Sequence, residues 1–379
     1  MEINKLILKE DLNPKKKGRN AGIDLLRILG MLDIVVCHTI IDSNIYNRYS
    51  KYFNQIKYME VFTNWHISTF GIISGIVGFR NYKTLKYSNL LYLWLLVTFY
   101  QITVHISYNI YRNIHSSLNI RYFFPAINGN HWYFTCYFGM YFFLPIINRG
   151  LFYLTKNEFT IIVISLIGIF VFWRDYNLYL AYKELDPFSM NSGRSMIGLI
   201  LFYIIGAYIG KYLINDTKKR KIYYYLICIL VFVVSGHLIN HYLNYIGYQN
   251  YKRALKALFG FRLNSIPTLL QSISLALFFS HLKFNNNLAK FISFFGQLAF
   301  SVYIIHDQID IRYVIFTNLF HKYPYEYSLS HVLFLIVLNA LRYFLICMII
   351  DIGRFLLFKL FRVRKLCLFL DKIINLFTK

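Results

Sequence analysis

Charged side chains are scarce in this sequence, and acidic ones most of all. Only 15% of the residues are charged, whereas 57% are hydrophobic and 20% are aromatic. A water-soluble chain of several small domains carries a larger share of charge. The composition therefore indicates that lipid is much of the solvent around this chain.

Linkers, repeats and cysteine motifs are also missing. No stretch rich in glycine, serine or proline divides the 379 residues, and no fixed-period repeat is apparent. The five cysteines form no CxxC pair, so we expect neither a disulfide framework nor a metal site. The apolar run after residue 20 lacks a small-residue cleavage site, which favours a retained first helix over a signal peptide. We expect one membrane domain.

Positive charge is abundant by contrast. The sequence contains 41 Lys and Arg residues against 17 Asp and Glu, a formal net charge of +24. A compact basic module would indicate nucleic acid, but most of these residues lie between apolar runs of about 20 residues, as in cytoplasmic loops of membrane proteins. We expect no nucleic-acid partner. Some of the charge suits anionic membrane lipids or a phosphate-rich cofactor.

Hydrophobic windows predict an all-α fold, a polytopic bundle of about ten transmembrane helices. The windows are 21–43, 58–79, 88–112, 131–150, 158–174, 195–214, 222–243, 263–282, 294–310 and 328–351. An even number places both termini on one side, and basic residues at 15–19 and 354–365 assign that side to the cytoplasm. We therefore expect a cytoplasmic segment 1–20, a transmembrane domain 21–351 and a basic amphipathic cytoplasmic tail 352–379.

The connecting loops support this orientation. Basic residues follow the even-numbered helices, namely Arg80, Lys83 and Lys86 after the second, Lys211 and Lys218–Lys221 after the sixth, and Lys283 and Lys290 after the eighth. The segment 250–262 breaks the pattern because its four basic residues would lie outside. An interfacial helix and a miscounted span both explain it.

The first predicted helix carries four ionisable residues: Asp24, Arg27, Asp33 and His38. Each such residue costs on the order of 3 kcal/mol in a spanning helix, so it needs a partner or water and is a site candidate. At about 100° per residue, Arg27 and His38 fall on one face about 16 Å apart, and Asp24 joins that face. This line of polar groups indicates a water-filled path. The alternative is an i,i+3 ion pair between Asp24 and Arg27, with His38 as a packing histidine.

Asp33 belongs to a different surface of this helix, about 120° away from Arg27. The residue is either protonated or paired with a basic group of a neighbouring helix. The sequence does not name that partner.

The end of the second helix combines small residues with a basic strip. The run Gly71–Gly78 contains three glycines and a serine, which are small enough for close helix packing. Arg80, Lys83 and Lys86 follow at intervals of three and present a basic strip to phosphates. Ordinary cytoplasmic topology is the alternative explanation of the strip.

Two later segments place polar residues at the same outer level. His131–Tyr133 opens the fourth helix, where such residues are typical of an aromatic interface belt. His306 and Asp307 lie near the end of the ninth helix. A lone histidine there is more often structural, but His38 approaches the same level from the first helix, so His306 and Asp307 become site candidates.

Taken in order, four segments resemble the acyltransferase-3 family of bacterial membrane acyltransferases, in particular its polysaccharide O-acetyltransferase branch. They are Asp24 to His38, with the family's pattern of Arg, ten residues and His, FGIISG at 70–75, HWYFTCYFGMYFFLPIIN at 131–148, and FGQLAFSVYIIHD at 295–307. The resemblance covers nearly the whole chain. It implies an enzyme of the bacterial plasma membrane.

The resemblance further implies transfer of an acyl group, usually acetyl from cytosolic acetyl-CoA, to a hydroxyl of a cell-surface or lipid-linked glycan. The family's first-helix motif falls on Arg27 and His38, and its basic donor segment falls on Arg80 and Lys83, with Lys86 beside it. The family's second arginine is here Lys83, which attracts phosphate but lacks the planar fork of arginine.

These positions predict a mechanism with one open choice. His38 is either the general base for a sugar hydroxyl or the acetyl acceptor in a two-step route. Asp24 orients or balances Arg27, and His306 with Asp307 lines the acceptor side. The alternatives are a carrier or flippase of lipid-linked sugars, which inverted repeats would favour, and a glycan polymerase, which long polar outer loops would favour. The sequence shows neither feature.

Overall fold

The computed structural model of the protein describes residues 19–79, 86–114, 116–173, 186–214, 226–235, 264–317 and 319–377. Every regular element in these ranges is a helix, and they contain no strand. The predicted all-α class is therefore confirmed. Each of the ten predicted windows overlaps described helix, and the seventh overlaps the short helix Leu226–Ser235.

Four of the described helices are long and apolar enough to cross a membrane. They are α6 (Tyr87–Arg112), α10 (Met196–Tyr208) with its continuation η5 (Ile209–Leu213), α14 (Asn286–His306) and α16 (Leu329–Leu360). Many of the exposed side chains along α16 are large and apolar, such as Phe334 at 61% and Ile349 at 68% exposure. Such a surface belongs in lipid, so the chain is a polytopic helical membrane protein.

The remaining helices are shorter or more polar. They are α2 (Ala21–Ile41), α3 (Ile45–Arg48), α4 (Phe53–Phe62), α5 (His66–Gly78), α7 (Trp132–Tyr153), α8 (Lys156–Ile167), α13 (Ile266–His281), α15 (Ile309–Ile315) and α17 (Val363–Phe377). Short turns of helix connect them: η1 (Ser50–Tyr52), η2 (Ile120–Phe123), η3 (Gly168–Phe172), η4 (Asn191–Gly193) and η7 (Leu319–Lys322).

The predicted second helix, 58–79, is divided in the structure. A turn at residues 63–65 separates α4 from α5, and the Thr63 hydroxyl donates to the Glu60 carbonyl at 2.7 Å. Glu60 also binds the Lys57 ammonium at 2.6 Å and the Tyr46 hydroxyl. Lys57 and Glu60 belong to α4 and Tyr46 to α3, so the polar contacts lie before the turn and the apolar helix α5 begins after it.

Two other boundaries differ from the predicted ones. α14 begins at Asn286 rather than 294 because the Asn285 side chain caps it, accepting the Leu288 amide at 2.9 Å. Lys290 therefore lies inside α14 and not in the predicted loop. α16 continues past 351 to Leu360.

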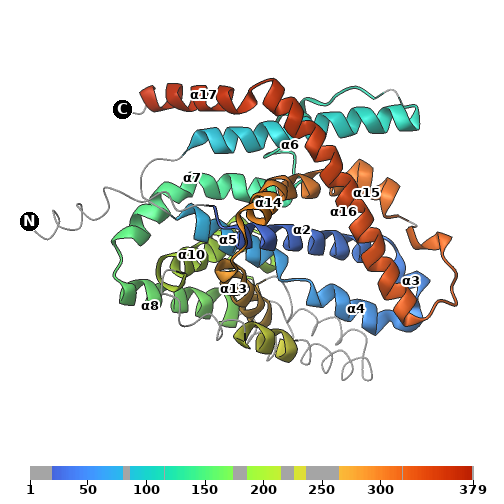
Figure 1. Ribbon diagram of the computed structural model, residues 1–379, viewed down its shortest axis with the longest axis horizontal. Coiled ribbons are helices and arrows are strands. Elements are labelled where there is room, and N and C mark those ends of the chain that lie inside the picture. The colour runs from blue at the N-terminus through green and yellow to red at the C-terminus, as the bar shows by residue number, and fades with distance from the viewer. Residues whose placement is uncertain are drawn as a thin grey trace, which may run out of the picture.

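The tail is helical as well. α17 lies beside α6 in Figure 1, where the Arg364 guanidinium donates to the Asn89 side chain at 2.6 Å and the Ser88 hydroxyl to Asp371 at 3.2 Å. Phe369 and Leu376 on another side of α17 are exposed. α17 thus turns polar side chains to α6 and leaves apolar ones exposed, and the basic amphipathic cytoplasmic tail at 352–379 stays a prediction.

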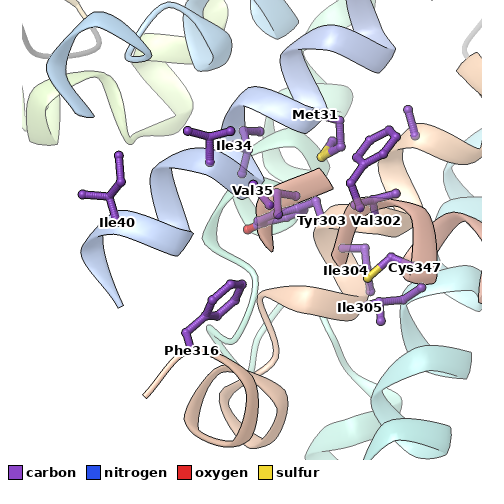
Figure 2. Close-up of a cluster of buried hydrophobic side chains, with 14 of the residues drawn as sticks. Met31, Ile34, Val35, Ile40, Val302, Tyr303, Ile304, Ile305, Phe316 and Cys347 are labelled. Atoms are coloured by element: carbon purple, nitrogen blue, oxygen red, sulfur yellow. The ribbon is translucent and has the colours of Figure 1, made fainter. Parts of the chain in front are cut away.

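α2 occupies the centre of the bundle (Figure 1). It packs against α5, α13, α14 and α16. One buried apolar cluster joins α2, α6, α14 and α16, and Figure 2 draws part of it, with Val35 from α2 and Val302 from α14. A second cluster joins α5, α7 and α10. The polar residues of α2 are thereby held between neighbouring helices.

Glycines let α5 and α10 approach backbone to backbone. A Cβ atom on Gly75 would overlap the Tyr203 carbonyl oxygen, and one on Gly206 would overlap the Ile72 carbonyl oxygen. The small-residue run of the second predicted helix therefore serves close packing, as the sequence indicates.

We expect Gly75→Ala to destabilise the protein by about 1 to 3 kcal/mol, because the added methyl group must push two helix backbones apart. Thermal unfolding of the purified protein in detergent measures this. Gly353→Ala is the matched control, since in the described structure its Cβ meets no other atom within 4 Å. An unchanged melting temperature for Gly75→Ala would contradict the close packing.

Candidate functional site

Two histidines from helices far apart in the sequence meet near one end of the bundle. His38 lies in the last turn of α2 and His306 is the last residue of α14. The His38 Nδ1 atom lies 3.1 Å from the His306 Nε2 atom, and the ring centroids are 5.1 Å apart. The structure thus brings together two of the predicted site residues.

The hydrogen bonds define which ring nitrogens carry protons. The His306 Nδ1 atom lies 2.6 Å from the Val302 carbonyl oxygen, which only accepts, so Nδ1 is the protonated nitrogen of that neutral ring. Its Nε2 atom then accepts a hydrogen bond from His38 Nδ1. His38 is left with the lone pair on Nε2. The arrangement orients a neutral imidazole with its basic nitrogen outside the histidine pair.

Asp307 stands directly beside this pair. Its Oδ1 atom lies 3.4 Å from His38 Nδ1 and also 3.4 Å from the Arg312 guanidinium on α15. Arg312 in turn binds Asp42 through two nitrogens, at 3.1 and 2.5 Å. The carboxylate of Asp307 is therefore placed to stabilise positive charge on His38 while Arg312 holds it in position.

Asp33 finds the basic partner that the sequence leaves unnamed. His66, the first residue of α5, places Nδ1 at 3.0 Å from the Asp33 carboxylate and at 2.6 Å from the Thr63 carbonyl oxygen. His66 is buried. Because the Thr63 carbonyl only accepts, His66 also carries its proton on Nδ1 in the neutral ring.

A small cavity joins His38 to His66. It has a volume of about 50 Å³ and is lined mainly by apolar and aromatic side chains, including Phe70, Trp132 and Tyr303. Trp132 thus faces the interior of the bundle rather than only the membrane interface. His131 is buried too, with Nε2 at 3.1 Å from the Ile304 carbonyl oxygen, where it ties α7 to α14. The prediction that His131–Tyr133 forms an aromatic belt at the membrane interface is therefore wrong, because these residues lie inside the bundle.

A ladder of tyrosines on α7 runs from this cavity toward the start of α6. Tyr133 lines the cavity, its ring centroid lies 6.4 Å from that of Tyr137, and Tyr137 lies 6.3 Å from Tyr141. The Tyr141 hydroxyl donates to the Lys86 carbonyl oxygen at 2.8 Å. The ladder connects the histidine pair with the only member of the predicted basic strip that lies in the described residues.

Lys86 has an exposed side chain directly before α6. Arg80 and Lys83, the other two predicted donor residues, lie outside the described residues. Within the described part of the chain, no three His, Cys, Asp or Glu side chains gather in a group that could hold a metal ion.

Asp24 and Arg27 form the i,i+3 ion pair that the sequence offers as the alternative to a water-filled path. The Arg27 guanidinium lies 2.6 Å from the fully buried Asp24 carboxylate, which also accepts from Arg19 at 3.0 Å. Gly296 of α14 leaves room for this carboxylate, since a Cβ there would lie 2.7 Å from the Asp24 Cβ. The pair sits at the opposite end of α2 from His38.

Sequence reasoning missed His66, Asp42 and Arg312. For His66 a signal existed, because Asp33 required a basic partner on another helix. Asp42 and Arg312 are separated by 270 positions and sit in no motif, so no local pattern could have paired them.

Comparison with known proteins adds a family. A family model described as an acyltransferase domain matches residues 20–367. Neither a curated protein nor a solved structure matches the chain. The matched range contains both ends of the polar line on α2 and the histidine pair.

We expect Asp24→Asn to lower the free energy of unfolding by about 3 kcal/mol, because Arg27 would lose the carboxylate that balances it inside the bundle. Chemical or thermal unfolding in detergent measures the change. Glu326→Gln, which removes an exposed carboxylate, is the control and should unfold like the wild type. Wild-type stability of Asp24→Asn would show that water, rather than Asp24, balances Arg27.

Proposed function

We propose that this chain, which belongs to the acyltransferase domain family, transfers an acetyl group from cytosolic acetyl-CoA to a hydroxyl of a cell-surface or lipid-linked glycan. The family match and the apolar helices make the chain a membrane acyltransferase. The observation that carries the proposal is the hydrogen-bonded chain from Val302 through His306 to His38, with Asp307 beside it.

The chemistry assigned to His38 is general base catalysis. The lone pair on His38 Nε2 accepts the proton of the acceptor hydroxyl as its oxygen attacks the thioester carbonyl carbon. A C–O bond forms and the C–S bond breaks. The CoA thiolate leaves and takes the proton from the imidazolium, which restores the neutral ring. The charge on the imidazolium is stabilised by the Asp307 carboxylate at 3.4 Å.

His306 acts as a positioning residue in this scheme. Its Nε2 atom accepts a hydrogen bond from the Nδ1–H group of His38 and so selects the tautomer with the basic Nε2. Its own orientation is held by the Val302 carbonyl. Neither role requires His306 to touch the substrate.

The donor is proposed to enter along the basic strip. The phosphates of acetyl-CoA would bind Arg80, Lys83 and Lys86, and the long pantetheine arm would pass along the tyrosine ladder toward the apolar cavity beside His38. Two observations support this path: Tyr141 contacts Lys86, and Tyr133 lines the cavity. Arg27 is paired with Asp24, so we assign it to balancing that buried carboxylate rather than to phosphate.

His38→Ala should lower acetyl transfer by 10²- to 10⁴-fold, the usual loss when a general base is removed. The measurement is transfer of radiolabel from acetyl-CoA to membrane glycan by membranes containing the full chain. The variant should still express and fold, since the imidazole lines a cavity, with a modest loss of thermal stability because His306 Nε2 loses its donor. His331→Ala, at an exposed histidine, is the control.

Three outcomes bear on the scheme. Substantial activity in a folded His38→Ala protein would remove His38 from the chemical step. Label trapped on His38 of the wild type would replace direct transfer by the two-step route. A wild-type chain that moves lipid-linked saccharide, or extends it, without transferring label would be a carrier or a polymerase and would overturn the proposed function.

Arg80→Ala and Lys83→Ala should each raise the KM for acetyl-CoA, because each removes a phosphate partner whose charge-assisted hydrogen bond contributes about 1.5 to 3 kcal/mol. Steady-state kinetics at varied acetyl-CoA measures the change. Lys83→Arg is the matched companion, and it should preserve or lower the KM because it adds a bidentate fork. An unchanged KM in both alanine variants would assign these residues to topology alone.

A further inference from the structure

A second cavity lies beside Arg312, the residue whose guanidinium contacts Asp307. Its volume is about 180 Å³, and the described residues that line it are Asp42, Ile309, Arg312 and Thr317. At roughly 30 Å³ per water molecule, that space corresponds to about six waters, the scale of one sugar ring. Arg312 reaches solvent, with 37% of its side chain exposed.

The two cavities differ in chemistry. The cavity that contains His38 and His66 is lined mainly by apolar and aromatic side chains, which suit an acyl chain. The second has a carboxylate, a guanidinium and a hydroxyl on its wall. A carboxylate accepts hydrogen bonds from sugar hydroxyls and a guanidinium donates to them, so this wall can hold a polyol in place of water.

The second cavity is connected to the histidine pair through a single atom. Asp307 Oδ1 lies 3.4 Å from Arg312 and 3.4 Å from His38 Nδ1. A molecule held by Arg312 is therefore one side chain away from the proposed general base. Asp307 contacts His38 at Nδ1, so an acceptor bound by Arg312 must extend past Asp307 to present its hydroxyl to the basic Nε2 atom.

The charges at this cavity select among sugars. Two carboxylates, Asp42 and Asp307, surround one guanidinium, and Asp42 already engages Arg312 through two nitrogens. An acidic sugar would bring a third carboxylate against these two, which is unfavourable. The hydroxyls of an uncharged sugar would replace the water molecules at these charged groups.

We propose that the Asp42–Arg312–Thr317 cavity is the acceptor subsite and that it binds an uncharged, hydroxyl-rich saccharide in preference to an acidic one. This inference rests on the proposed function, because it names the substrate class of the same site. It assigns Asp42 and Arg312 to binding and leaves the proton transfer to His38.

Calorimetric titration of the detergent-solubilised full chain tests the subsite without acetyl-CoA. The probes are neutral tetramers of glucose, galactose and N-acetylglucosamine, with a glucuronate tetramer as the acidic counterpart. At least one neutral tetramer should bind about tenfold more tightly than the acidic one, and Asp42→Asn should weaken that binding by about tenfold, the loss of one charge-assisted hydrogen bond.

Thr317→Trp is a second test in case Asp42→Asn fails to fold. The tryptophan fills the cavity from an exposed position and leaves the Asp42–Arg312 ion pair intact. It should also abolish neutral-saccharide binding. Asp310 lies on α15, as Arg312 does, but does not line the cavity, so Asp310→Asn should bind like the wild type. Equal binding of the acidic tetramer, binding unaffected by Thr317→Trp, or no neutral tetramer bound would each overturn the subsite.

The same proteins separate this inference from the proposed function. If the chain binds saccharide in an Asp42-dependent way but transfers no acetyl label, the subsite is supported and the proposed function is wrong. Acetyl transfer that persists in Thr317→Trp with an unchanged KM for the acceptor glycan would retain the function and remove the subsite.

Discussion

The arrangement of this bundle depends on one constraint: the polar groups of α2 lie where lipid cannot solvate them, so each must be paired inside the protein. Asp24 is paired with Arg27 in a space that a glycine of α14 leaves open. Asp33 is paired with His66 of α5, and His38 with His306 of α14. Because these partners come from the helices on either side, satisfying α2 also positions α5 and α14 around it.

Local patterns in the sequence predict much of this arrangement. Apolar windows place the helices, and i,i+3 spacing predicts the Asp24–Arg27 pair that the structure contains. The small-residue run of α5 predicts a close helix contact, and the backbone of α10 provides it at Gly75. The meeting of His38 with His306 required more than spacing. It followed from their common level in the membrane and from the resemblance to a known family.

Other features depend on contacts between residues far apart in the sequence, which helical periodicity cannot predict. The helical period gives the direction in which Asp33 points, but it does not identify His66 as its partner. The turn at 63–65 divides α4 from α5, and just before it Glu60 binds Tyr46, a residue of another helix that periodicity does not identify. Arg312 lies beyond the predicted helix end, on a short helix whose position only tertiary packing determines.

The proposed reaction also explains why the site has two cavities rather than one. A thioester exposed to water beside a general base would be hydrolysed, so the acyl group needs surroundings that exclude water. The acceptor, in contrast, must be bound through its hydroxyls by groups that water also reaches. On the proposed mechanism, His38 stands at the boundary between these environments, with the apolar cavity on one side and Asp307 with Arg312 on the other. Because Asp307 contacts both His38 and Arg312, a saccharide bound to Arg312 as we propose would change the electric field at His38 and so would couple acceptor binding to the proposed chemical step.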